Sequence, residues 1–181
     1  IIGSYNIGKE KRVLLFAHWD TRPFSDRDAD PANHRKPILG ANDGASGVGV
    51  LPEVARNIQA KSPNVGVDII FFDAEDWGYP SFLENEPAGE WWCLGSQYWA
   101  KNPHVPGYKA KYGILLDMVG APSAKFGKEH FSKQYAGDVV EKVWSVARQL
   151  DYGAYFVNKD GDSVMDDHVP VIRDRKIPSI D

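Results

Sequence analysis

Four runs of apolar residues, rich in β-branched and aromatic side chains, recur along the chain. The first three are continuous rather than alternating, as is typical of central strands that are covered on both faces. A fifth strand is expected to begin in the final residues. The predicted strands lie at residues 12–20, 65–76, 112–120, 154–159 and 177–181.

Helical periodicity falls between these runs. Residues 137–150 place their apolar side chains on one face, which predicts an amphipathic helix, and residues 95–102 predict a shorter one. Residues 46–60 also have helical spacing, with Ser46 as a candidate N-cap. Pro52 lies inside that segment and costs about 3 kcal/mol in a helix interior, so a kink or local break is expected there. This alternation of strands and helices predicts an α/β protein, a three-layer α/β/α sandwich around a mixed, mostly parallel sheet.

Length and composition fit one folded domain. The chain has 181 residues and a net charge of −4, and its Lys and Arg residues are scattered, so a nucleic-acid partner is not indicated. No apolar run approaches the roughly 20 residues of a membrane span. The single Cys93 excludes an intramolecular disulfide. The chain opens on an apolar IIGSYNIG and closes on KIPSID, so we expect residues 1–181 to be one domain cut from a longer protein at both ends.

Two long polar stretches, residues 21–37 and 79–92, interrupt the pattern. Loops of that length in a compact domain are usually functional or mobile.

Acidic side chains gather where the predicted strands end. Ligands of open α/β sheets bind outside the carboxyl ends of the strands, so these acids are expected at one rim. They are Asp20 (with His18) after the first strand, Asp73, Glu75 and Asp76 after the second, Asp117 after the third, Asp43 within GANDGASG (40–47), and Asp166 and Asp167 (with His168) in a loop at 162–170.

A single acid at a strand end is usually a turn or cap residue. Several converging acids repel one another and need a counter-charge, and the nearest basic residues, Arg22 and Arg173, are few. A divalent metal therefore fits better. Oxygen and imidazole ligands without thiolate admit Zn, Mn or Co, and less readily Mg.

The adjacent acids Glu75 and Asp76 suggest a division of roles. Neighbouring residues at a strand end point in different directions, so one carboxylate can bind the metal while the other stays free for proton transfer.

The segments HWD, GANDGASG, FDAED, LLDMVG and DDHVP, in this order, resemble the zinc-dependent aminopeptidase superfamily that includes the glutaminyl-peptide cyclotransferases. The likeness extends from about residue 12 to residue 181. It implies a catalytic domain with a larger mixed sheet flanked by helices, a zinc cofactor, and peptide or protein N-termini as substrates. Bacterial relatives are often exported, which implies a periplasmic or secreted protein.

In the cyclase branch, the resemblance implies one zinc with Asp43 and Asp76 among its ligands. Glu75 would be the general acid/base, and Asp117 and Asp166 would form a hydrogen-bonded pair beside the substrate.

In the aminopeptidase branch, the resemblance implies two metals, with Asp43 bridging them. His18, Asp76 and Asp117 would supply further ligands, and Glu75 keeps its role.

Two details favour the cyclase branch. LLDMVGAP resembles the cyclase signature Leu-Asp-Leu-Ile-Gly-Ala-Pro, and two acids precede His168, where aminopeptidases more often have Ser-Asp-His.

The chain departs from the family pattern in two places. Asp76 stands where animal cyclases have Glu. Both branches take a last His ligand from a segment that would follow Asp181. We attribute the absence of this ligand from residues 1–181 to truncation.

The sequence thus predicts conversion of N-terminal glutamine to pyroglutamate with release of ammonia. The alternatives are a di-zinc aminopeptidase and a catalytically inactive binding module of the same fold.

Overall fold

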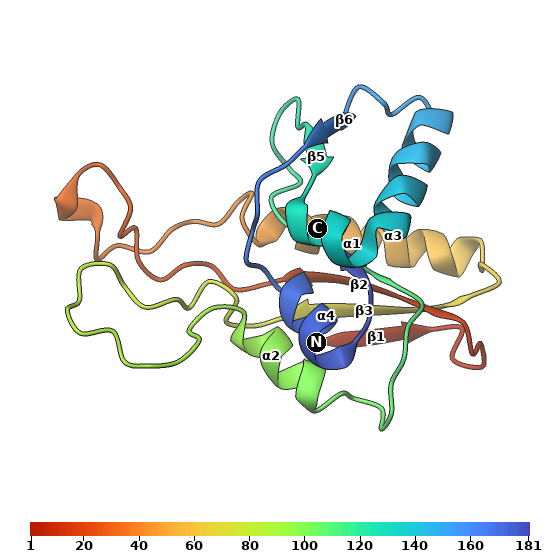
Figure 1. The fold of residues 1–181 in the computed structure, drawn as a ribbon, viewed down its shortest axis with the longest axis horizontal. Helices are drawn as coiled ribbons and strands as arrows, with labels where there is room; N and C mark the ends of the chain where they lie inside the picture. Colours follow the sequence, from red (N-terminus) through yellow and green to blue (C-terminus); the bar gives the residue numbers. More distant parts are fainter.

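A five-stranded sheet runs through the middle of the molecule in the computed structural model, which describes residues 1–181 (Figure 1). Only the edge strand β1 is antiparallel to its neighbour, so the sheet is mixed and mostly parallel, as predicted. The strands lie in the order β1 (Ile2–Tyr5), β3 (Gly66–Phe72), β2 (Arg12–His18), β4 (Gly113–Leu115) and β7 (Ser179–Ile180).

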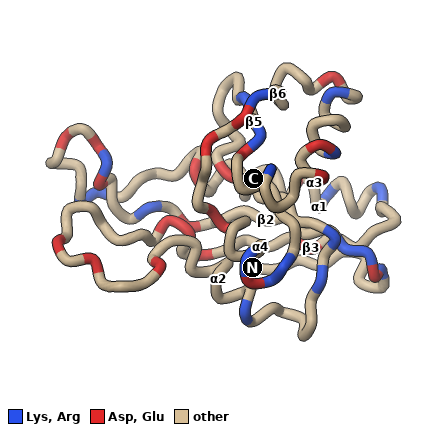
Figure 2. Tube along the Cα trace, viewed as in Figure 1, with Lys and Arg blue, Asp and Glu red and all other residues tan.

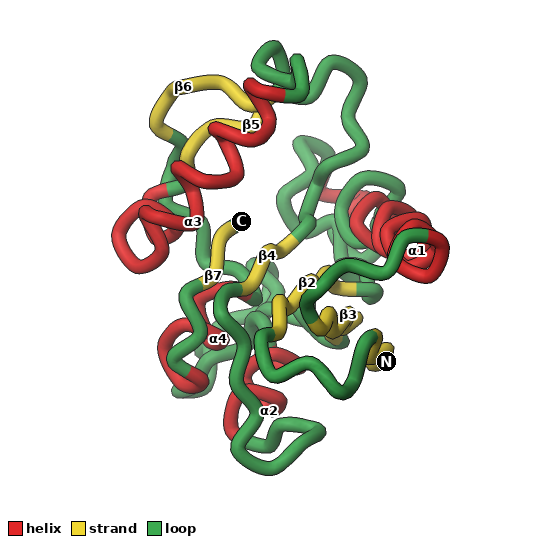
Figure 3. Tube along the Cα trace, turned by 90° about the vertical axis from the view of Figure 1, so that its right-hand side faces the viewer, coloured by secondary structure: helices red, strands yellow, loops and turns green.

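Helices cover both faces of this sheet (Figure 3). On one side lie α1 (Ala45–Ala60) and α3 (His130–Gln149). On the other side α2 (Leu94–Lys101) packs against α4 (His168–Arg175). The predicted three-layer α/β/α sandwich is therefore confirmed.

The pleat of β2 explains why its sequence is continuously apolar. Leu14 and Phe16 belong to the core cluster that also contains residues of α2 and α4, whereas Leu15 and Ala17 belong to the cluster that contains Leu51 of α1. Because successive side chains point to opposite faces, a strand between two helical layers needs apolar residues at every position.

Several predicted elements differ from those observed. The strand predicted at 112–120 ends at Leu115, and the predicted fourth strand, β6 (Phe156–Asp160), pairs with β5 (Phe126–Lys128) in a separate two-stranded sheet. The loop expected at 162–170 ends in the first residues of α4. A short 3₁₀ helix, Pro31–Asn33, lies in the first long loop.

Helix α1 also departs from expectation. It continues through Pro52 without a break, with Pro52 exposed and Leu51 beside it fully buried against the sheet. Ser46 is not the N-cap. It lies inside the first turn, where its hydroxyl donates to the Asn42 carbonyl at 2.5 Å and accepts from the Val119 N–H at 3.0 Å.

The start of α1 lies unusually close to the sheet. A Cβ atom at Gly47 would stand 2.0 Å from the Leu116 carbonyl oxygen and 2.8 Å from the Ala17 Cβ. Only glycine permits this approach. It brings the loop before α1 next to the end of β4, and these two segments carry Asp43 and Asp117.

Glu129 caps α3 and supports a prediction about acid stability. Its carboxylate accepts from the N–H groups of Phe131 and Ser132 at 2.8 and 2.6 Å and from that of Val164 at 3.2 Å, and His168 Nε2 lies 3.3 Å away. Burial alone raises the pKa of Glu129, but His168 and these N–H groups outweigh it and lower the pKa to about 2.

Replacing Glu129 with glutamine should remove stability that is present only above pH ~4.5. A lowered folded-state pKa means that the unfolded chain binds more protons as the pH falls, so this stabilisation disappears between about pH 4.5 and pH 2. We expect Glu129→Gln to lower the free energy of unfolding by about 1–2 kcal/mol at pH 6, with the difference shrinking towards pH 2. Urea unfolding across this range measures it. Asp138→Asn, at an exposed position of the same helix, is the control, and a pH-independent difference would contradict the assignment.

Candidate active site

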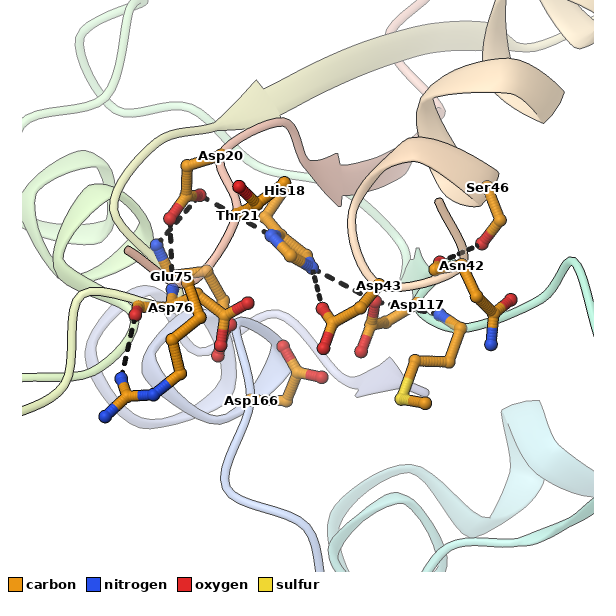
Figure 4. Close-up of polar contacts among 12 residues, drawn as sticks. His18, Asp20, Thr21, Asn42, Asp43, Ser46, Glu75, Asp76, Asp117 and Asp166 are labelled. Carbon is orange, nitrogen blue, oxygen red and sulfur yellow. Dashed lines mark hydrogen bonds and ion pairs between the residues drawn. The ribbon is translucent and has the colours of Figure 1, made fainter. Parts of the chain in front are cut away.

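His18, the last residue of β2, stands at the centre of the acidic rim (Figure 4). Its side chain is fully buried, and its Nε2 lies 3.1 Å from an oxygen of Asp43 and 3.1 Å from an oxygen of Asp117. Its Nδ1 lies 3.5 Å from Asp20. Burial alone lowers the pKa of His18, but the three carboxylates outweigh it and raise the pKa. The imidazole thus links acids from three segments of the chain.

Asp20 organises the turn that follows β3. Its two carboxylate oxygens accept the N–H groups of Glu75 and Asp76, each at 3.1 Å. Ala74, just before them, has a left-handed φ of 54°. Asp20 thus holds the backbone of both predicted functional acids.

Three side chains form a group that fits a metal ion. Donor atoms of His18, Asp43 and Asp76 all lie within 4.8 Å of one another. Burial, followed by the nearby charge of Asp43, raises the pKa of Asp76 to about 6. Carboxylates held this close favour a cation, and an imidazole–carboxylate donor set suits zinc. The structure therefore brings the predicted ligands Asp43 and Asp76 together, with His18 beside them.

Glu75 points into a second buried group. Ligand atoms of Glu75, Cys93 and Asp166 also lie within 4.8 Å of one another, and the Cys93 thiol donates to Glu75 Oε1 at 3.3 Å. Glu75 is only 7% exposed. This burial, followed by the charge of Asp167, raises the pKa of Glu75 to about 8. A carboxyl group with such a pKa can both accept and donate a proton near neutral pH.

Asp166 is buried beside Glu75, and its hydrogen bond to Asp117, which the family resemblance implied, stays a prediction. Asp166 accepts from the Asp167 N–H at 2.5 Å, while Asp117 contacts His18 and accepts from the Met118 N–H at 2.8 Å. Burial raises the pKa of Asp166 well above its ordinary value. The two acids belong to the same rim, where the charge of Asp117 also acts on Asp166.

Asp167 is a buried acid to which the sequence assigned no role. Its side chain is inaccessible to solvent, and burial raises its pKa to about 7. Its charge acts on Glu75, as described above. The DDH triplet could have indicated one buried acid, but nothing in the pattern indicates that both acids lie inside.

The N-terminus of α2 supports the turn of Glu75 from the other side. The N–H groups of Cys93, Leu94 and Gly95 donate to the carbonyls of Glu75, Ala74 and Asp73 at 2.9–3.0 Å. A Cβ atom at Gly95 would stand 2.3 Å from the Asp73 carbonyl oxygen. Sequence analysis missed this contact, which joins backbone atoms about twenty residues apart.

Negative charge dominates the rim. Acidic positions cluster where the long loops leave the sheet, whereas Lys and Arg are dispersed over the molecule (Figure 2). Buried Arg22 is close by, but its guanidinium pairs with Asp26 and with backbone carbonyls instead of the rim carboxylates. His18 is therefore the one basic side chain that pairs with the rim carboxylates and would compete with a bound cation for them.

The site lies at the carboxyl ends of a mostly parallel sheet between two helical layers. It combines a buried acid with an imidazole–carboxylate group. Both features are those of the zinc-exopeptidase fold. The chain belongs to peptidase family M28, whose family model matches residues 1–181.

Known proteins similar to the chain agree with this class. A solved Zn-dependent exopeptidase from Parabacteroides distasonis is 59% identical, with a TM-score of 0.96, over 99% of this chain and 61% of that one. A solved glutaminyl cyclase from Tannerella forsythia is 59% identical, with a TM-score of 0.94, over 99% of this chain and 62% of that one. Glutaminyl-peptide cyclotransferase from Bos taurus is 27% identical over 98% of this chain and 54% of that protein. The chain thus spans about half to three-fifths of the length of these relatives.

None of the helices is both long enough and apolar enough to span a membrane.

Proposed function

We propose that the full-length protein is a zinc-dependent glutaminyl-peptide cyclotransferase. It converts the N-terminal glutamine of peptides to pyroglutamate and releases ammonia. The observation that carries this proposal is the buried Glu75. Its carboxyl group lies beside Asp166, and the next residue in the chain is the candidate ligand Asp76. The similarity to glutaminyl cyclases gives the substrate class.

Asp43 and Asp76 are the residues of this chain that would hold zinc. The bound zinc would polarise the side-chain amide of the substrate glutamine and stabilise negative charge on its oxygen.

Glu75 carries the proton. As the substrate α-amine attacks the side-chain amide carbon, Glu75 accepts a proton from the amine nitrogen. It then donates this proton to the departing amide nitrogen, so the carbon–nitrogen bond breaks and ammonia leaves. A carboxyl pKa of about 8 suits both steps.

Asp117 and Asp166 orient the reacting nitrogen atoms from the same rim. Burial keeps water away from Asp166, which strengthens its interaction with an amine.

Hydrolysis of N-terminal residues by a two-metal centre is the second candidate. It is supported by His18 Nε2, which lies 3.1 Å from both Asp43 and Asp117. These three residues would hold the second metal, with Asp43 shared between the two metals. The similarity to a Zn-dependent exopeptidase is consistent with it.

Metal content and product analysis of the full-length protein separate these functions. We expect one zinc per chain, together with ammonia release and a pyroglutamyl product from peptides that begin with glutamine. Peptides that begin with alanine are the matched control and should stay intact. Two tightly bound metals with release of free N-terminal residues would favour the aminopeptidase. Absence of both activity and bound metal would favour a binding module.

A further inference from the structure

The backbone of Asp76 is held at both of its polar ends. Its N–H donates to Asp20 Oδ2 at 3.1 Å, and its carbonyl oxygen accepts from Arg22 Nη1 at 3.0 Å. Asp20 and Arg22 lie two residues apart in one loop, so that loop grips the residue that carries the candidate metal ligand. Proton transfer by Glu75 involves neither the Arg22 side chain nor this contact.

The Arg22 guanidinium makes four hydrogen bonds with its five N–H groups. Nε and Nη2 donate to the two carboxylate oxygens of Asp26 at 2.8 and 2.7 Å, and Nη1 donates to the carbonyls of Asp76 and Gly78 at 3.0 and 3.3 Å. The guanidinium carbon lies 4.6 Å from the centre of the Trp92 ring. Arg22 is 7% exposed, so this geometry is sheltered from competing water.

Asp26 anchors the guanidinium to the second long loop. It is 5% exposed, and besides its pairing with Arg22 its Oδ2 accepts from the Ser81 N–H at 2.8 Å. The Ser81 hydroxyl donates to the Asp26 carbonyl at 2.8 Å. Both long loops leave the body of the molecule on the same side (Figure 1). Arg22 and Asp26 therefore fix the base of one loop to the other at the residues next to Asp76.

We propose that Arg22 is a positioning residue for the candidate zinc ligand Asp76, acting through the Asp76 carbonyl. This inference rests on the metal site of the proposed function. A guanidinium binds a carboxylate with two parallel N–H donors, and its remaining nitrogen can still donate to other acceptors in the same plane. A lysine ammonium does not reproduce this fixed planar arrangement. Loss of that fork leaves the peptide after Asp76 free to rotate, and the Asp76 side chain then loses its fixed direction.

Arg22→Lys in the full-length protein tests this inference through metal binding rather than turnover. We expect zinc affinity, measured by competition with a chromophoric chelator, to fall by roughly 10-fold or more, because groups that orient metal ligands typically contribute 10- to 100-fold. The visible absorption spectrum of the Co²⁺-substituted protein should change as well, since its bands report the ligand geometry. Arg27→Lys is the matched control, because Arg27 lies in the same loop but is exposed. It should leave the affinity and the spectrum unchanged.

Asp26→Asn provides a second, independent variant. It keeps one acceptor for Arg22 but removes the charge that orients the fork, so a smaller loss of zinc affinity is expected, and it carries the test if Arg22→Lys does not fold. Folded variants with lower melting temperatures but with wild-type affinity and Co²⁺ spectrum would overturn the inference and leave the proposed function intact. A wild-type protein that binds no zinc would instead overturn the proposed metal site, and this inference with it.

Discussion

Glu75→Gln is expected to lower the turnover of glutaminyl peptides severely while zinc remains bound. Glutamine has nearly the same shape as glutamate and can still accept from the Cys93 thiol, which contacts Glu75 Oε1 at 3.3 Å. It cannot take the proton from the attacking amine. General acid–base groups accelerate reactions roughly 100- to 10,000-fold, so kcat should fall by a factor of that size. Steady-state ammonia release and zinc content, measured on the same preparation, provide the two readouts.

Asp73→Asn is the control for this substitution. Asp73 belongs to the same turn, but its side chain is exposed and accepts only from the neighbouring Ala74 N–H at 2.9 Å. Its variant should retain near-normal kcat. If Glu75→Gln kept a near-normal rate with zinc bound, the proton-transfer role of Glu75 would be wrong. Loss of zinc along with turnover would show instead that Glu75 supports the metal.

The convergence of the acids was predictable because it follows from one rule. Long apolar runs identified β2 and β3, and parallel neighbours bring their carboxyl ends to one edge. His18, Asp20, Glu75 and Asp76 follow these two strands directly, and the structure places them together.

Elements without a strong local pattern were not predictable. Strand β1 has only four residues and is defined by its pairing with β3, more than sixty residues away. Helix α4 contains Val169, Pro170 and Val171, which have low helix propensity. Pro170 is nevertheless tolerated, because it lies in the first turn, where its missing N–H would have no helical partner.

The supports of the site were also hidden from sequence reasoning. The contact of Cys93 with Glu75 and that of Arg22 with Asp76 join residues 18 and 54 positions apart. From the sequence, a disulfide was excluded for Cys93, and Arg22 was only one of the few basic residues near the acids. Only the fold shows that both are buried against the functional acids.

Asp68 is a further example, since it lies within the apolar run that predicted β3. It is 1% exposed, and its carboxylate accepts from Arg12 Nε and Nη2 at 2.6 and 2.8 Å, from the Ser4 hydroxyl at 2.6 Å and from the Tyr108 hydroxyl at 2.7 Å. Burial alone raises the pKa of Asp68, but Arg12 and the two hydroxyl groups outweigh it and lower the pKa. The carboxylate thus ties β1, β2 and the segment after α2 to the middle of β3.

Asp68→Ala should therefore destabilise the full-length protein by about 3–5 kcal/mol, the cost of removing one partner from a buried ion pair. The substitution leaves the Arg12 guanidinium without its carboxylate partner, with only backbone carbonyls as acceptors, and the Tyr108 hydroxyl without an acceptor. Both side chains are largely shielded from water. Glu53→Ala is the matched control, because Glu53 pairs with Arg56 at 2.6 Å on the surface of α1, where the two side chains are 54% and 75% exposed. An exposed pair of this kind contributes about 0–1 kcal/mol. Urea unfolding of both variants beside the wild type measures the difference, and equal small losses would mean that water reaches Arg12 and replaces the carboxylate.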